Sequence, residues 1–300
     1  MKILVTGGAG FIGSNLIESL NKDHEIVVID NLNSGDTSNL KNSDITFIGN
    51  SVNTILEYDI PGIDIIYHFG IPSSSPMYKE KPILVGNAIN GAISIFEFAK
   101  REGVKKIIYA SSSSLYNGLE APHKENMMIN ITDYCTEARL AIERIAKLYN
   151  NLHGIKSVGL RFFSVYGPHE EAKGKYANII TQFLWKMQKG ESPEIYGNGL
   201  QSRDFIFVKD VVQACTLMLK NDFINYEILN VGTGRSYSFN AIVSMLNYKL
   251  ETNIEPKYIQ MPMSNYVDKT QADLTKIKKF GYEPRYSLSQ GIDELINKNV

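Results

Sequence analysis

A glycine-rich turn near the start of the chain has the residue types that bind a dinucleotide. Gly7, Gly10 and Gly13 follow an apolar run and open a helical pattern. One glycine permits the tight turn, one lets the backbone approach a pyrophosphate, and one lets helix and strand pack closely. The helix that begins at Phe11 and Ile12 would turn its free N–H groups and the positive end of its dipole toward the phosphates. Taken alone, the motif could also be a turn without a ligand.

A carboxylate follows at the distance that such a site requires. Asp30 ends the second apolar run, about 20 residues beyond the glycines. There an acidic side chain accepts hydrogen bonds from the hydroxyls of an adenosine ribose and repels a 2′-phosphate. The predicted cofactor is therefore NAD and not NADP. Asp30 could instead only begin the turn over residues 30–35, but the glycine motif favours the ligand interpretation.

Short apolar runs alternate with helical patterns through the first half of the chain and would position these residues. Near-continuous apolar runs are typical of parallel strands that are covered on both faces. The expected strands are residues 2–6, 25–29, 45–48, 64–68, 106–110 and 157–161. The expected helices are residues 11–20, 82–101, 133–152, 176–189, 209–220 and 240–250. This alternation predicts an α/β fold, a doubly wound parallel sheet of the Rossmann type.

The helical and strand patterns loosen from about Gly167, where loops punctuated by glycine and proline begin. We therefore expect two domains. Residues 1–165 would hold the NAD, with a return contribution from about 204–232. Residues 166–300 would form a smaller, mixed substrate domain.

Composition excludes several classes of protein. The 31 basic and 32 acidic residues give a net charge of -1, so no overall field would hold nucleic acid or an anionic membrane surface. Two cysteines are too few for a disulfide framework, and the 5 histidines do not sit at a metal-ligand spacing. No signal-peptide pattern and no long apolar run occurs. We expect a cytoplasmic protein without a metal, nucleic-acid or membrane partner.

Several further motifs lie along the chain in a recognisable order. They are Ala-Ser-Ser-Ser-Ser-Leu-Tyr at 110–116, Leu-Arg-Phe-Phe-Ser-Val-Tyr-Gly-Pro at 160–168, Arg-Asp-Phe-Ile-Phe-Val-Lys-Asp at 203–210 and Asn-Val-Gly-Thr-Gly at 230–234. With the glycine motif, the chain resembles the extended short-chain dehydrogenase/reductase family, and most closely its nucleotide-sugar epimerases of the UDP-glucose 4-epimerase kind. The resemblance implies tightly held NAD, a nucleoside diphosphate sugar (most simply a UDP-sugar) in the cleft between the domains, and a homodimer.

The resemblance also implies roles for individual residues. Ser112 takes the family's catalytic Ser/Thr position, and its hydroxyl would bond the reacting oxygen of the sugar; alternatively it satisfies its own backbone at a serine-rich strand end. Arg203 would hold the diphosphate through its planar guanidinium, or else pair with Asp204 at the surface. The other implied substrate residues are Ser164, Asn178, which could also be an ordinary helical Asn, and Tyr196, which could be plain core. The further implied cofactor residues are Asn31, Asn33, Ser34, Asn50, Ser51 and Gly70.

Some positions depart from the family's pattern. The family usually has Asn where Ser164 stands, an acidic residue where Asn50 lies, and a basic residue near Met263. Hydrogen-bonding capacity remains at 164 and 50, but none of strength at 263. These departures put the phosphate affinity and the identity of the substrate in question.

The family's catalytic pair, Tyr-x-x-x-Lys on a helix and often followed by Glu, is incomplete. Arg139 and Glu143 match the basic residue and the Glu, so Cys135 stands where the tyrosine belongs. Arg139 keeps the positive charge that would hold the nicotinamide ribose and lower the pKa of a phenol. A cysteine sulfur stops several ångströms short of a phenolic oxygen, and a thiol has a pKa of about 8.5 where a phenol has about 10. Tyr134 is turned by about 100° around the helix and cannot substitute.

Three hypotheses follow. The first is NAD-dependent epimerisation of a nucleoside diphosphate sugar at C4, of the UDP-glucose/UDP-galactose type, with Ser112, Cys135 and Arg139 as catalytic residues and Cys135 as the cause of impaired turnover. The second is a non-catalytic protein that binds NAD and a nucleotide sugar on the same fold. The third is a nucleotide-sugar dehydratase, although no Asp-Glu pair follows Ser112 to act as dehydrating acid and base.

Overall fold

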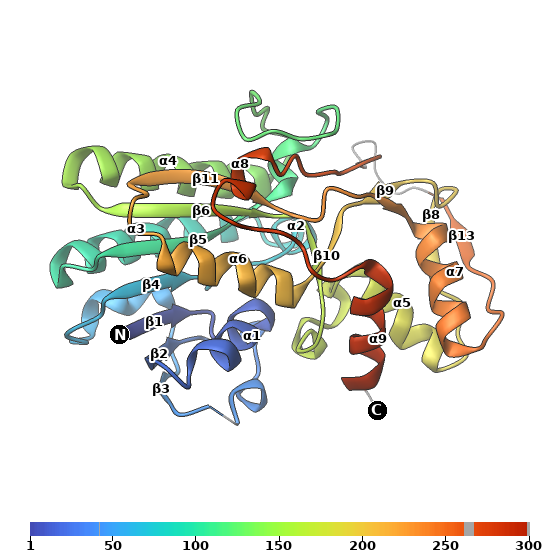
Figure 1. Cartoon of the computed structure of the whole chain (residues 1–300), viewed down its shortest axis with the longest axis horizontal. Helices are drawn as coiled ribbons and strands as arrows, with labels where there is room; N and C mark the ends of the chain where they lie inside the picture. Colours follow the sequence, from blue (N-terminus) through green and yellow to red (C-terminus); the bar gives the residue numbers. More distant parts are fainter. Residues whose placement is uncertain (42, 261–266, 299–300) are drawn as a thin grey trace.

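A seven-stranded parallel sheet forms the centre of the protein in a computed structural model that describes residues 1–41, 43–260 and 267–298 (Figure 1). The strand order is β11-β6-β5-β4-β1-β2-β3. The strands are β1 (Lys2–Thr6), β2 (Glu25–Ile29), β3 (Ile45–Ile48), β4 (Ile65–His68), β5 (Lys106–Ser112), β6 (Lys156–Phe162) and β11 (Tyr226–Val231). The six predicted strands are all present. The prediction of a doubly wound α/β fold is therefore confirmed.

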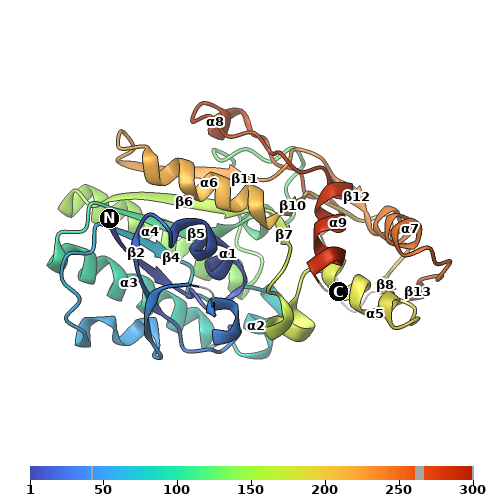
Figure 2. The same cartoon turned by 60° about the horizontal axis from the view of Figure 1, so that its bottom comes forward.

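Helices cover both faces of this sheet. Helices α1 (Phe11–Leu20) and α6 (Val208–Lys220) pack together on one face, and α3 (Leu84–Glu102) and α4 (Tyr134–His153) pack together on the other (Figures 1 and 2). Both α3 and α4 end at a glycine in the left-handed conformation, Gly103 and Gly154, each with φ of 68°. Glycine adopts that conformation without steric cost and so ends a helix cleanly. The helical periods read from the sequence are confirmed to within a few residues.

Short elements line the carboxyl end of the sheet. The short helix α2 (Ser75–Glu80) follows β4, and the 3-10 turns η1 (Thr37–Leu40), η2 (Val52–Glu57) and η3 (Ser113–Tyr116) follow β2, β3 and β5. Beyond β6 come the strands β7 (Ser164–Tyr166), β9 (Ser202–Arg203), β10 (Phe205–Phe207) and β12 (Tyr237–Ser238), the turn η4 (Glu171–Tyr176) and the helix α8 (Thr275–Lys278).

A second, smaller lobe has an apolar core of its own. It contains α5 (Ile179–Gln188), α7 (Phe239–Leu250), α9 (Leu288–Lys298), β8 (Glu194–Tyr196) and β13 (Lys257–Ile259). Phe183, Phe239 and Ile292 are buried together there, and Figure 1 shows this lobe beside the carboxyl end of the sheet. Ala272 and Tyr282 belong to the larger core instead. The division of the chain at residue 165 stays a prediction.

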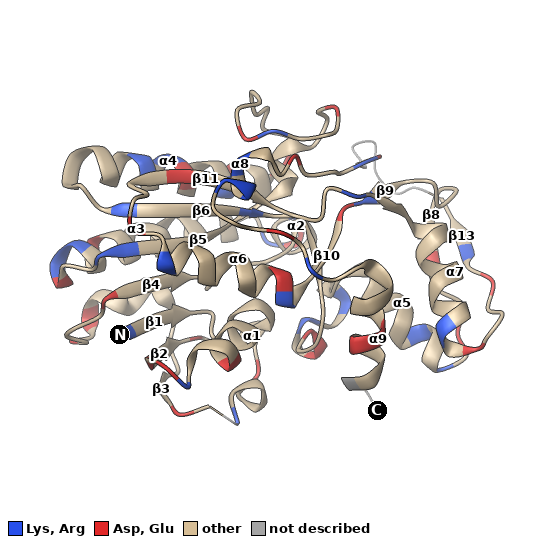
Figure 3. Cartoon of the chain, viewed as in Figure 1, with Lys and Arg blue, Asp and Glu red and all other residues tan. Residues whose placement is uncertain are grey.

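The surface of the described part of the chain has a mixed charge. Lysines and arginines are interspersed with acidic residues over both lobes (Figure 3). In the residues that the structure describes, no helix has the length and apolar character needed to cross a bilayer.

Candidate active site

A cavity of about 640 Å³ opens at the carboxyl ends of the sheet strands. Ligands of open α/β sheets bind at this edge. Most of the predicted site residues line the cavity: Gly7, Gly10, Phe11, Ile12, Gly13, Asp30, Asn31, Asn33, Ser34, Ser51, Gly70, Ser112, Arg139, Ser164, Asn178 and Arg203. Three predicted residues are not part of its lining: Asn50, Cys135 and Tyr196.

The glycine turn is packed too closely for any side chain. Gly7 has φ of 69°, and a Cβ atom built there would lie 2.7 Å from the backbone nitrogen of Gly70. A Cβ atom at Gly13 would lie 2.3 Å from the carbonyl oxygen of Gly7. Gly10 precedes α1 without a side-chain cap, so the first N–H groups of α1 are left for a ligand. This cradle fits a pyrophosphate.

Asp30 both begins its turn and lines the cavity. Its carboxylate accepts hydrogen bonds from the backbone N–H of Ala9 (3.0 Å) and of Leu32 (2.8 Å). Burial raises the pKa of Asp30, and these backbone hydrogen bonds act in the opposite direction. The two interpretations offered by the sequence are therefore compatible, because each carboxylate oxygen can accept more than one hydrogen bond.

The end of β5 presents a cluster of hydroxyl groups. Ser112 accepts hydrogen bonds from the backbone N–H (3.1 Å) and the hydroxyl (2.9 Å) of Ser114, and so caps η3. The local role considered for Ser112 is thus present, and the side chain also lines the cavity. A hydroxyl oxygen that accepts two hydrogen bonds still has its own proton to donate to a ligand.

Helix α4 turns one face toward the end of β5. Cys135, Arg139 and Glu143 are buried at a spacing of four residues, whereas Tyr134 is 50% exposed. The predicted helical register is therefore confirmed. Arg139 donates to the carbonyl oxygens of Ala110 (3.1 Å) and Pro72 (2.8 Å), which joins β5 to the segment before α2.

Cys135 does not reach the cavity. Its sulfur lies 3.8 Å from the hydroxyl of Ser114. Burial raises the pKa of the thiol, and the nearby charge of Arg139 acts against that rise. The thiol therefore stays neutral at pH 7 and is a poor proton acceptor in this position.

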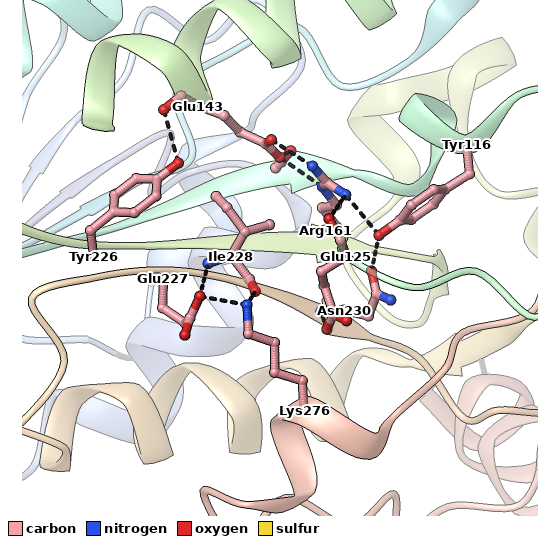
Figure 4. A network of polar contacts seen from close by, with 10 residues as sticks. Tyr116, Glu125, Glu143, Arg161, Tyr226, Glu227, Ile228, Asn230 and Lys276 are labelled. Atoms are coloured by element: carbon pink, nitrogen blue, oxygen red, sulfur yellow. Dashed lines mark hydrogen bonds and ion pairs between the residues drawn. The ribbon is translucent and has the colours of Figure 1, made fainter. Parts of the chain in front are cut away.

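A buried polar network fixes the geometry behind this cluster (Figure 4). Glu143 accepts a hydrogen bond from Ser111 (2.6 Å) and two from the guanidinium of Arg161 (2.9 and 2.7 Å). Arg161 also donates to the hydroxyl of Tyr116 (2.8 Å), which donates to Asn230 (2.7 Å). The network joins α4, β5, η3, β6 and β11, and it holds both ends of the segment that carries Ser112.

The remaining predicted residues lie toward the smaller lobe. Arg203 donates to the carbonyl oxygen of Ser202 (2.8 Å) and lies 5.5 Å over the ring of Phe239. The alternative interpretation placed Asp204 at the surface, and this is wrong. Asp204 is fully buried and accepts hydrogen bonds from Thr233, Gly234 and Ala272.

Asn178 is not an ordinary helical asparagine, because it caps α5: its amide oxygen accepts from Ile180 and its amide nitrogen donates to Val165. Tyr196 is 38% exposed, and Asn50 donates to the hydroxyl of Tyr58. Met263 lies outside the described residues.

Comparison with known proteins identifies the family. A family model with the description "NAD dependent epimerase/dehydratase family" matches residues 3–232. The chain belongs to this family. A solved UDP-glucose 4-epimerase from Thermotoga maritima, with UDP-glucose, superposes with a TM-score of 0.91 at 29% identity, covering 99% of this chain and 98% of that one.

Two further epimerases are similar to this chain over most of their length. A Thermus thermophilus UDP-glucose 4-epimerase in complex with NAD has a TM-score of 0.87 at 25% identity, covering 99% of this chain and 98% of that one. A UDP-glucuronate 4-epimerase from Thermodesulfobacterium geofontis is 29% identical over 313 residues, covering 98% of this chain and 94% of that one. All three of these proteins are named as nucleotide-sugar 4-epimerases, and the family cofactor, NAD, fits the glycine cradle and Asp30.

Lys173 and Ser75 are among the charged or hydroxyl-bearing residues of the lining that the sequence did not single out. Lys173 lines the cavity and pairs with the fully buried Glu170 (2.8 Å), which also accepts from the backbone of Asn178 (2.8 Å). Ser75 lines the cavity as well. Neither residue stands in one of the motifs that carry the resemblance to the family.

Proposed function

We propose that this protein binds NAD and a UDP-sugar of the UDP-glucose/UDP-galactose type and interconverts the two epimers at C4. The single observation that carries the proposal is that one cavity is lined by the glycine cradle, Asp30, Ser112, Arg139 and Arg203. When bound, NAD would supply a hydride acceptor that later returns the hydride. The epimerase names of the relatives support the reaction type.

The chain's own residues would divide the remaining work. Ser112 would donate a hydrogen bond to the reacting oxygen of the sugar, and Arg203 would hold the diphosphate through its planar guanidinium. Arg139 would supply the positive charge beside the nicotinamide ribose. Cys135 is buried away from the cavity, and we infer that turnover is slow for this reason.

A binding protein without turnover is the second candidate, and the buried, neutral thiol of Cys135 is the observation that favours it. The two candidates are separated by measuring binding and turnover on the same preparation. A coupled assay with UDP-galactose reports turnover, and calorimetry reports binding of NAD and UDP-glucose. A mass spectrum of any co-purified ligand would identify the sugar. Binding without any turnover would favour the second candidate.

A dehydratase finds less support. Of the described residues that line the cavity, Asp30 alone has a carboxylate, and it follows β2 beside the glycine cradle. The acid and base that dehydration requires are thus not provided by carboxylates of this lining.

We expect NAD to bind much more tightly than NADP, because the carboxylate of Asp30 favours a ribose diol and repels a phosphate. Asp30→Ala should weaken NAD binding and reduce the preference for NAD. Asp30→Asn is the matched variant, since it keeps an acceptor for the turn but removes the charge, and it should relax the discrimination against NADP. Calorimetry with both cofactors measures the effect. Equal affinities of the wild-type protein for NAD and NADP would contradict the assignment.

We also expect a homodimer formed through α3 and α4. Ile93, Leu148 and Leu152 are 39%, 52% and 65% exposed on these helices and would be covered by the second copy. Phe96, Phe98 and Ile142 on the same two helices are instead buried in the core of one protomer and are not available for this contact. Light scattering at micromolar concentration tests the expectation, and a particle of 33.7 kDa would refute it.

A further inference from the structure

A hydroxyl and a carboxylate are joined beside the cavity by residues that no motif singled out. The hydroxyl of Ser75, at the start of α2, donates to Oδ2 of Asp133 at 2.8 Å. The other carboxylate oxygen of Asp133 accepts from the backbone N–H (2.8 Å) and the hydroxyl (3.0 Å) of Thr136 and so caps α4. Asp133 therefore links the start of α2 to the first turn of α4.

Ser75 and Asp133 lie near the end of β5 that carries Ser112. Arg139 bridges the carbonyl oxygens of Pro72 and Ala110, which ties the segment that carries Ser75 to the end of β5. The hydroxyl oxygen of Thr136 lies 3.5 Å from the carbonyl oxygen of Ser114. Ser75 and the hydroxyl cluster of β5 are thus both held against the first turns of α4, and Ser75 and Ser112 line the same cavity.

Ser75 offers a ligand a hydrogen-bond acceptor, and Ser112 offers it a hydrogen-bond donor. The proton of Ser75 is given to Asp133, so its oxygen presents only lone pairs to the cavity and acts as an acceptor. Ser112 already accepts two hydrogen bonds and presents its proton. A sugar hydroxyl between them finds an acceptor for its hydrogen and a donor for its oxygen.

We propose that Ser75, backed by Asp133, accepts the proton of the sugar hydroxyl at the reacting carbon, the role for which Cys135 is misplaced. The sugar O–H bond breaks and its proton passes to the oxygen of Ser75, while the proton of Ser75 passes to Oδ2 of Asp133. When bound in the glycine cradle, NAD would supply the acceptor for the hydride that this carbon gives up as its C=O bond forms, and the return step would reverse each transfer. A carboxylate is a weak base, so this route is slow. The inference rests on the proposed function.

Asp133→Asn tests the route with little change in shape, because asparagine is as good a helix cap as aspartate but cannot take the proton. We expect its kcat for UDP-galactose to fall about 10²-fold, the lower end of general-base effects. Its calorimetric Kd for UDP-glucose should stay within about threefold, as expected for a group that acts mainly in the reaction step. Tyr134→Phe, on the exposed face of α4, is the control that should keep full turnover. In a Cys135→Tyr background, where a phenol takes over, Asp133→Asn should have little effect.

A binding measurement tests Ser75 without any turnover. The wild-type protein should bind UDP-glucose about fivefold more tightly than its 4-deoxy analogue, because the analogue has no hydrogen to give to Ser75. The analogue also lacks the oxygen to which Ser112 would donate, so Ser75→Ala should reduce this difference and not abolish it. If NAD and UDP-glucose do not bind at all, the proposed function fails. If they bind but turnover is absent, or if both variants leave kcat and the discrimination unchanged, the inference is overturned and the proposed function stands.

Discussion

Cys135→Tyr should raise the rate of epimerisation of UDP-glucose and UDP-galactose by about 10²- to 10⁴-fold, the usual worth of a positioned general acid and base. Position 135 shares the buried face of α4 with Arg139 and lies 3.8 Å from Ser114 at the end of β5. A tyrosine at position 135 would extend past the serines at the end of β5 toward the cavity, which the shorter side chain of Cys135 does not reach. The charge of Arg139 on the same helical face would lower the pKa of the phenol. A coupled spectrophotometric assay measures the gain.

The matched control is Cys135→Phe, which adds the same ring without the hydroxyl and should give no comparable gain. Tyr134→Phe in the Cys135→Tyr background should leave the rate nearly unchanged, because Tyr134 is 50% exposed and faces away from β5. Fast turnover of the wild-type protein that disappears in Tyr134→Phe would instead show that Tyr134 is the working phenol.

The sheet could be read from the sequence because its inner strands are apolar on both faces. β1 and β4, for example, are almost wholly buried runs, and such runs are typical of parallel strands. β11 was expected only as a return segment, since it is an edge strand whose first residues, Tyr226 and Glu227, are partly exposed. The continuous apolar signal is therefore missing at that edge.

The site residues also differ in whether a local pattern in the sequence could predict them. The glycine cradle and Asp30 follow local patterns that spacing can place, and the register of α4 followed from the resemblance to the family's Tyr-x-x-x-Lys motif. Ser75 and Asp133 are 58 residues apart in the sequence, and their contact depends on how α2 packs against α4. Nothing in either segment alone predicts the other. The same holds for Asn178, whose role as a cap is set by where α5 begins.

Glu143→Ala should lower the free energy of unfolding by about 3–5 kcal/mol, because it leaves the guanidinium of Arg161 buried without its countercharge. Both side chains are about 5% exposed, and the ion pair between them is 2.7 Å long. Urea denaturation followed by circular dichroism measures the loss. Lys105→Ala is the matched control: it removes a shorter ion pair, 2.6 Å from Asp64, in which the lysine is 71% exposed. Its unfolding midpoint should hardly move, since exposed pairs contribute little.

The double variant Glu143→Met with Arg161→Met separates two contributions to the free energy of unfolding: that of the ion pair itself, and the cost of leaving one charge buried without its partner. Apolar side chains of similar length remove both charges together, so the double variant should be more stable than Glu143→Ala. It should nevertheless lose the hydrogen bonds to Ser111 and Tyr116 that hold the two ends of the Ser112 segment. We therefore expect it to fold and to bind UDP-glucose, but to turn over more slowly than the wild-type protein. A double variant less stable than Glu143→Ala would show that the ion pair itself, and not the unpaired arginine, accounts for the stability.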